Sequence, residues 1–110
     1  MLPFANRLPS ETIRELLRSG KRISCDWYQL TYKKTTGMPR FGFIVSTKIN
    51  KRAVVRNRIR RLLRESAQHL LPVLSACDCV VVVQKNITEK TEIVVEQGMR
   101  DVFQGAGLLK

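Results

Sequence analysis

The feature that most constrains the fold of this chain is a basic stretch over residues 48–64 that also carries an apolar stripe. The stretch holds eight Lys and Arg residues and no Asp or Glu. Apolar residues recur at helical spacing at Val55, Ile59, Leu62, Leu63 and Leu70. This spacing predicts an amphipathic helix over about 51–70, which Pro72 ends. One side of the helix can pack on a core while the other presents cations to a partner.

The polar side of this helix carries uncompensated positive charge. Opposite the apolar stripe lie Asn57, Arg60, Arg61 and Arg64, with Arg56 and Arg58 on its two flanks. A solvated helix normally mixes charges, because like-charge neighbours repel and opposite charges at i,i+4 attract. Arginine dominates here, and its planar guanidinium bonds phosphate oxygens bidentately. A nucleic-acid face is therefore a better interpretation than a merely solubilising surface.

The net charge of the chain is concentrated in its middle third. The formal charge is +11 over 110 residues, and residues 27–64 hold eleven basic residues and no acidic one. Residues 1–26 hold five basic and three acidic residues, and residues 65–110 hold four basic and six acidic residues, so the charges of these two segments, +2 and −2, cancel. Localised charge indicates a directed binding face. The length predicts a single domain over 1–110, and a hydrophobic fraction of 44% excludes a disordered basic tail.

The residue types of a self-sufficient nuclease are missing. Phosphodiester hydrolysis usually needs clustered carboxylates with a divalent metal, or a pair of histidines. Residues 27–64 contain no carboxylate, and His69 is the only histidine. Cys25, Cys77 and Cys79 offer too few ligands for zinc, so we interpret them as reduced thiols. No catalytic residue, metal site, small-molecule site, signal peptide or membrane span is predicted for this chain.

The N-terminal part predicts an arm followed by a short helix. Residues 1–9 contain two prolines and are expected to be irregular. Ser10 is a plausible N-cap for a helix over about 10–19, and Gly20 is a plausible left-handed stop.

Two strands are predicted between the two helices. Apolar and polar residues alternate over 22–33, and residues 41–45 form a more continuous apolar run. Turn-forming residues separate these segments, which predicts an antiparallel pair. Aromatic and basic residues interleave here, so Tyr28 and Tyr32 are candidate platforms for unpaired bases. The alternative that such aromatics fill the core stays open for Tyr32.

The C-terminal part predicts a buried strand and a helix. The β-branched run at 78–84 predicts a central strand, and the order strand, helix, strand indicates a crossover between parallel neighbours. Residues 89–104 are ambiguous, because Ile93-Val94-Val95 favours a strand while the wider apolar spacing favours a helix. We choose the helix. Residues 105–110 are expected to be a frayed tail.

Residues 53–65 resemble the signature helix of the bacterial ribonuclease P protein subunit. The Arg56-Asn57-Arg58 core, followed by an aliphatic and two basic residues, is the hallmark of that family, and Asn6-Arg7-Leu8 resembles its opening. The predicted elements and the resemblance together imply a small α+β sandwich. It has a central, mostly antiparallel four-stranded sheet and about three helices in the order α-β-β-(β)-α-β-α. The resemblance also implies a left-handed β-α-β crossover, against the general right-handed rule.

The resemblance implies a function in tRNA maturation. In this family the RNA subunit performs hydrolysis with bound Mg²⁺, and the protein assists a holoenzyme that removes the 5′ leader of precursor tRNA. Contacts to the catalytic RNA are implied for Lys48, Lys51, Arg52, Arg56, Asn57, Arg58, Arg60, Arg61 and Arg64. Contacts to the leader are implied for Asn6, Arg7, Ile13, Leu17, Tyr28, Tyr32 and Arg40. The expected partners are ribonuclease P RNA and precursor tRNA, with Mg²⁺ bound mainly by the RNA, in a bacterial cytoplasm.

This sequence departs from the family pattern at the first helix. Family members commonly carry aromatic side chains where Ile13 and Leu17 stand, so stacking from that side is lost. Thr47 also stands where a lysine is common. Two other functions stay open. They are a non-catalytic RNA-binding ribosomal or assembly protein of similar fold, and a DNA-binding module with the basic helix in a major groove.

Overall fold

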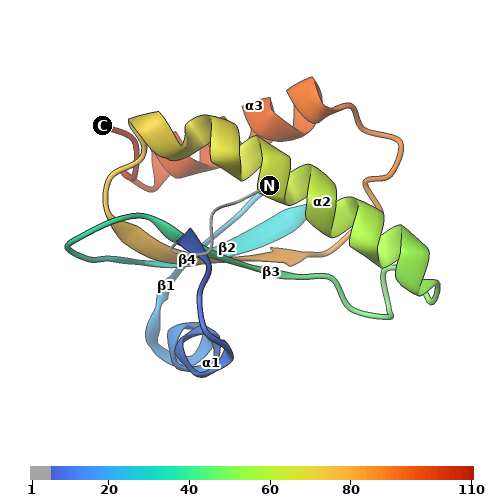
Figure 1. Ribbon diagram of the computed structural model, residues 1–110, viewed down its shortest axis with the longest axis horizontal. Helices are drawn as coiled ribbons and strands as arrows, with labels where there is room; N and C mark the ends of the chain where they lie inside the picture. Colours follow the sequence, from blue (N-terminus) through green and yellow to red (C-terminus); the bar gives the residue numbers. More distant parts are fainter. Residues whose placement is uncertain (1–5) are drawn as a thin grey trace.

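The structure is a computed structural model that describes residues 6–110. Within this range three α-helices flank a single four-stranded sheet (Figure 1). In chain order the elements are α1 (Ser10–Ser19), β1 (Lys21–Ser24), β2 (Tyr28–Lys34), β3 (Arg40–Ile44), α2 (Ala53–Leu70), a short 3₁₀ helix η2 (Leu71–Val73), β4 (Cys77–Val83) and α3 (Glu92–Gly105). The predicted α+β class and element order are confirmed.

The strands lie in the order β1-β2-β4-β3. β2 is antiparallel to both β1 and β4, whereas β3 is parallel to β4. The predicted antiparallel pair of 22–33 with 41–45 is therefore wrong, because β4 lies between them and the first segment is two strands. The almost fully buried β4 takes the central position, as predicted. A parallel neighbour requires a crossover, which α2 supplies. The left-handed sense of that crossover stays a prediction.

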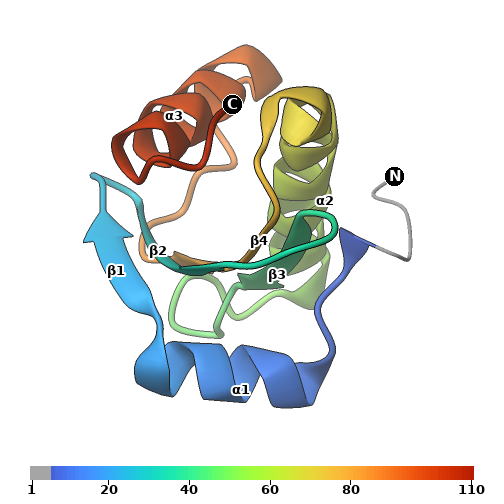
Figure 2. The ribbon, with the colours of Figure 1, turned by 90° about the vertical axis from the view of Figure 1, so that its left-hand side faces the viewer.

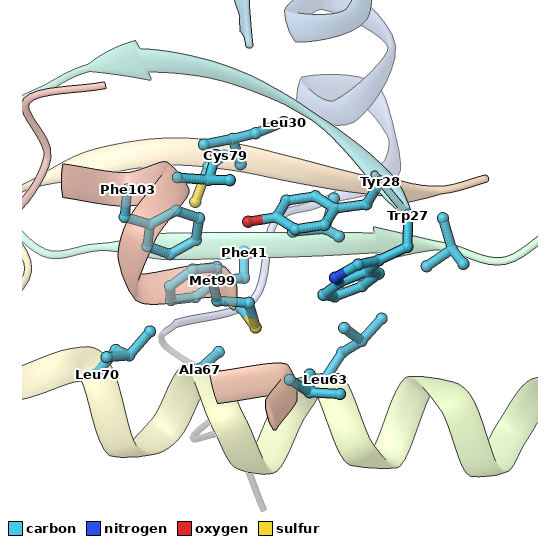
Figure 3. Close-up of a cluster of buried hydrophobic side chains, with 14 of the residues drawn as sticks. Trp27, Tyr28, Leu30, Phe41, Leu63, Ala67, Leu70, Cys79, Met99 and Phe103 are labelled. Atoms are coloured by element: carbon cyan, nitrogen blue, oxygen red, sulfur yellow. The ribbon is translucent and has the colours of Figure 1, made fainter. Parts of the chain in front are cut away.

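The molecule has three layers, with α2 and α3 on one face of the sheet and α1 on the other (Figure 2). The main core lies between the sheet and the helix pair (Figure 3). There Tyr28 and Phe41 from the strands meet Leu63, Met99 and Phe103 from the helices, all of them almost completely buried. Period-two alternation explains this, since alternate strand residues point to the same face.

A smaller core lies between α1 and the opposite face of the sheet. Leu16 from α1 and Val80 from β4 are buried there, while Ile13 and Leu17 are half-buried beside them. Gly42 of β3 allows this close approach, because a Cβ at that position would lie 2.7 Å from Ile13 Cδ1. The apolar stripe of α1 is thus used for packing.

The ends of α1 differ in detail from the prediction. Pro9, not Ser10, takes the N-cap position, and Ser10 is the first helical residue. Gly20 has φ −74°, so it is not the left-handed stop that we predicted. Its N–H instead donates to the Leu16 carbonyl at 2.7 Å, and the chain turns directly into β1.

Residues 105–110 are not the frayed tail that we predicted. Leu108 is completely buried in the main core. The Lys110 N–H donates to the Val73 carbonyl at 2.7 Å, and the Ser75 N–H donates to the Leu108 carbonyl at the same distance. The apolar side chain of Leu108 and these backbone bonds explain why the tail is docked.

Candidate nucleic-acid interface

The outer face of α2 presents three arginines that no other part of the described chain neutralises. Arg58, Arg61 and Arg64 are exposed and make no hydrogen bond or ion pair within residues 6–110. Together with Val54, Asn57 and Glu65 they line a shallow pocket of about 520 Å³. The opposite side of the same helix is locked in the core through buried Ile59, Leu63 and Leu70. These cations are therefore held on a rigid element with their charge directed outward.

The loop before α2 extends this cationic surface. Lys48, Lys51 and Arg52 are exposed, and their side chains have no partner in the part of the chain that the structure describes. The Asn50 side-chain oxygen accepts a hydrogen bond from the Arg52 N–H at 2.9 Å, which fixes the turn into the helix. We call the six unpaired cations of loop and helix the α2 surface: Lys48, Lys51, Arg52, Arg58, Arg61 and Arg64.

Three further residues of the predicted RNA-binding set hold local structure instead. Arg56 is half-buried, and its Nη1 donates to the carbonyls of Asn50 and Lys51 at 3.0 and 2.9 Å. Arg60 donates to the Asn57 side-chain oxygen at 2.7 Å and to the Val45 carbonyl at 3.3 Å. Arg56 and Arg60 therefore fasten α2 to the segment that leads into it.

The structure adds two residues that sequence reasoning missed. Thr88 and Lys90, from the loop between β4 and α3, line a pocket of about 220 Å³ with Arg58, Arg61 and Glu65. The sequence predicts a helix over 89–104 that includes Lys90, and no local pattern connects this residue with α2. Only the fold brings this loop beside the basic helix.

Tyr28 cannot serve as a platform for bases, so that prediction is wrong. Its side chain is completely buried on the face covered by α2 and α3. Its ring lies 4.2 Å from that of Trp27, centroid to centroid, and its hydroxyl donates to the Gly98 carbonyl at 3.4 Å. Burial raises the pKa of the Tyr28 hydroxyl well above its ordinary value.

Tyr32 and α1 lie on opposite faces of the sheet. Tyr32 follows the same alternation as Tyr28 and is half-buried against the main core. Ile13 and Leu17 pack on the other face. The predicted leader contacts at Tyr32 and on α1 therefore do not belong to one cleft.

Arg40 is neutralised within the molecule. Its Nε and Nη2 donate to the two carboxylate oxygens of Asp78, each at 2.9 Å. The hydrogen bonds to Asp78 raise the pKa of Arg40. The Asp78 side chain is only 11% exposed, so it depends on this bidentate partner. Arg40 holds the start of β3 to the start of β4 and offers little charge to RNA.

Asn6 and Arg7 lie along the outer edge of β3. The Asn6 side-chain amide donates to the Pro39 carbonyl at 2.7 Å, and the backbone of Arg7 forms a parallel bridge with Phe41. The end of the predicted irregular arm thus continues the sheet. Arg7 is exposed there.

The match to a family of known proteins covers nearly the whole chain. The family model for Ribonuclease P matches residues 3–107. The chain belongs to the ribonuclease P protein family. It is 34% identical over 91 residues to the ribonuclease P protein component of Xanthomonas oryzae pv. oryzae, which is 83% of this chain and 63% of the relative. It is 41% identical over 71 residues to that of a Marinomonas species, 64% of this chain and 54% of the relative. The chain thus spans less than two thirds of the length of these relatives.

Solved ribonuclease P proteins have the same fold. The Staphylococcus aureus RNase P protein superposes with a TM-score of 0.83 at 19% identity, covering 96% of this chain and 98% of that one. The Thermotoga maritima RNase P protein gives 0.70 at 23% identity, with coverages of 91% and 93%. At such identities the match shows the fold alone.

Two further observations on this ribonuclease P family member concern metal-binding side chains and membrane-spanning helices. Within residues 6–110 no three His, Cys, Asp or Glu side chains gather where they could hold a metal ion. None of the helices in that range is long and apolar enough to cross a membrane.

Proposed function

We propose that this chain is the protein subunit of ribonuclease P and binds the catalytic RNA of that holoenzyme through the α2 surface. The observation that carries the proposal is the set of unpaired cations on one face of a helix whose other face is buried. A rigid array loses little conformational entropy on binding a polyanion. Each phosphate that it neutralises also releases condensed counterions, which favours association.

The proposed role of the protein is charge compensation, and the RNA carries the catalysis. The described residues offer no carboxylate cluster that suits Mg²⁺, so we assign the metal to the RNA. Cations on α2 allow two polyanions, catalytic RNA and precursor tRNA, to approach each other. The free thiols of the three cysteines suit a reducing bacterial cytoplasm, where we place this complex.

We assign the 5′ leader of precursor tRNA to the side of the sheet that carries α1. Half-buried Ile13 and Leu17 support this assignment. Aromatic stacking does not contribute there, because Tyr28 is buried and Tyr32 faces the other way. The leader contact in this family member is therefore apolar and weaker than a stacked one.

Reconstitution tests the proposal. The protein is mixed with bacterial ribonuclease P RNA and precursor tRNA at low Mg²⁺, and release of the leader is measured. We expect the wild-type protein to accelerate release and the Arg58→Ala/Arg61→Ala variant to lose most of that effect. Lys85→Ala is the control, since it removes one cation that lies outside the α2 surface and pairs with Asp26. Absence of stimulation by the wild-type protein would contradict the proposal.

The same experiment separates the alternatives. A ribosomal or assembly protein of similar fold would bind the RNA without accelerating leader release. A DNA-binding module would be displaced from RNA by duplex DNA at comparable concentration. Competition with each nucleic acid at one salt concentration therefore distinguishes all three functions.

A further inference from the structure

A second basic surface lies at the edge of the sheet formed by β1 and β2. Lys21 pairs directly with Tyr32 across these strands, and Lys34 follows two residues later on β2. Directly opposite residues, and residues two apart on one strand, share a face of the sheet. Lys21, Tyr32 and Lys34 therefore stand together. A pocket of about 360 Å³ is lined by Ser19, Gly20, Lys21, Tyr32, Lys33, Lys34 and Ala106.

No acidic side chain lines this pocket. Lys21, Lys33 and Lys34 are exposed and form no ion pair within residues 6–110. Elsewhere the chain does pair its cations, as in the 2.9 Å contact between Lys85 and Asp26. Lys21 and Lys34 share one face of the sheet, so their ammonium groups repel each other, and an anion between them removes that repulsion.

The surroundings of the pocket orient its groups. Lys34 reaches the turn after α3, because a Cβ on Gly107 would lie 3.4 Å from its Nζ. The carbonyl end of α3 carries partial negative charge, which favours an ammonium at this place. Tyr32 is held by its core contacts with part of its side chain at the pocket, an arrangement suited to contact with a base or ribose.

We propose that Lys21, Tyr32, Lys33 and Lys34 form a second RNA-binding surface, the β1–β2 surface, which binds the phosphate backbone of an unpaired RNA segment. An acidic protein would satisfy the lysines but would leave the tyrosine ring without a specific role, so RNA fits better. The choice of RNA as partner rests on the proposed function. The RNA can be the catalytic subunit or the precursor, because both present the same phosphates.

The two surfaces bind different phosphates of the RNA. β1 and β3 are the two edges of the sheet, and α2 packs on the β3 side. Three strand spacings separate the edges, about 14 Å. No single phosphate group can contact both surfaces, so each surface binds phosphates of its own.

The test compares Lys21→Gln/Lys34→Gln with the matched control Lys85→Gln. Affinity for ribonuclease P RNA is measured over a range of salt concentrations, and precursor tRNA binding to the assembled holoenzyme forms a second arm. Loss of two phosphate contacts in unpaired RNA reduces the slope of log affinity against log salt by about 1.4. We expect this reduction in one arm and no change for Lys85→Gln. The arm that responds identifies which RNA occupies the surface.

Tyr32 is tested separately. Tyr32→Leu keeps apolar volume in the core but removes the ring, and we expect about fivefold weaker binding in the responding arm. Tyr32→Phe should bind as the wild type does. Thermal unfolding shows whether the leucine variant is folded at the assay temperature.

Unchanged salt slopes of the double lysine variant in both arms would overturn the proposal, including the case in which an acidic protein binds there. This failure differs from failure of the proposed function. If wild-type protein stimulates leader release while the lysine variant keeps its slopes, only the second surface is wrong. If stimulation is absent but the slopes fall, the second surface stands and the ribonuclease P assignment is wrong.

Discussion

At the scale of single residues, the partners of a charged side chain decide what it can do. Arg40 and Arg58 are both exposed enough to meet RNA, yet Arg40 is engaged by both oxygens of Asp78 whereas Arg58 has no partner in the described chain. A guanidinium that already serves a buried carboxylate gains little from a phosphate. Position and pairing therefore divide the basic residues into those that maintain the fold and those that can bind.

Arg40→Ala should reduce stability and leave RNA binding nearly unchanged. The substitution leaves the Asp78 carboxylate almost buried without a partner, which costs about 1–3 kcal/mol of unfolding free energy. Urea unfolding measures this loss, and Arg40→Ala/Asp78→Asn should recover part of it because no unpaired charge remains. A fall in the salt slope of RNA binding for Arg40→Ala would show instead that this arginine contacts phosphate.

At the scale of elements, α2 combines an anchored beginning with a free outer face. Its apolar periodicity predicted the helix within two residues, since the spacing of Ile59, Leu63 and Leu70 is a local signal. Which of its arginines anchor the helix and which stay free for binding was not predictable in the same way. Arg56 bonds carbonyls of the preceding loop, and helical projection says nothing about the path of that loop.

Arg56→Ala should lower the stability of the fold, whereas Arg58→Ala should lower the affinity for RNA. Arg56→Ala loses the hydrogen bonds to the Asn50 and Lys51 carbonyls, so we expect unfolding free energy to fall by about 1 kcal/mol. Arg58→Ala should keep full stability but bind ribonuclease P RNA more weakly, with a salt slope smaller by about 1. Urea unfolding and RNA titrations on both variants check this. Equal stabilities for the two would contradict the anchoring role of Arg56.

At the scale of the whole molecule, the pairing of strands that are far apart in the sequence determines the features that sequence analysis did not predict. The run at 78–84 is apolar enough to predict a central strand, but no local pattern shows that it separates β2 from β3. Likewise, alternation places Tyr28 and Tyr32 on one face, but which face α2 and α3 cover depends on the crossover. The candidate RNA-binding helix was therefore predictable, and the arrangement of the leader side was not.

Residues 106–110 are docked on the main core, and we expect this docking to be required for stability. Leu108→Ala removes a completely buried side chain from the main core and should cost about 3 kcal/mol. Lys110→Ala is the control, because its exposed side chain can be shortened without disturbing the backbone bond to Val73. Chemical denaturation of both variants measures the difference. Equal denaturation midpoints for the two variants would show that residues 105–110 are frayed after all.

The central position of β4 also has a consequence for synthesis on the ribosome. β2 and β3 have no bonded neighbour in common until Cys77–Val83 emerges, although both are translated much earlier. Nascent chains that stop before this point can pair β1 with β2, but β3 has no neighbouring strand and the apolar side of α2 lacks the buried strand β4 beneath it. Productive folding therefore waits until β4 has been synthesised, as the high sequence separation of these pairings requires.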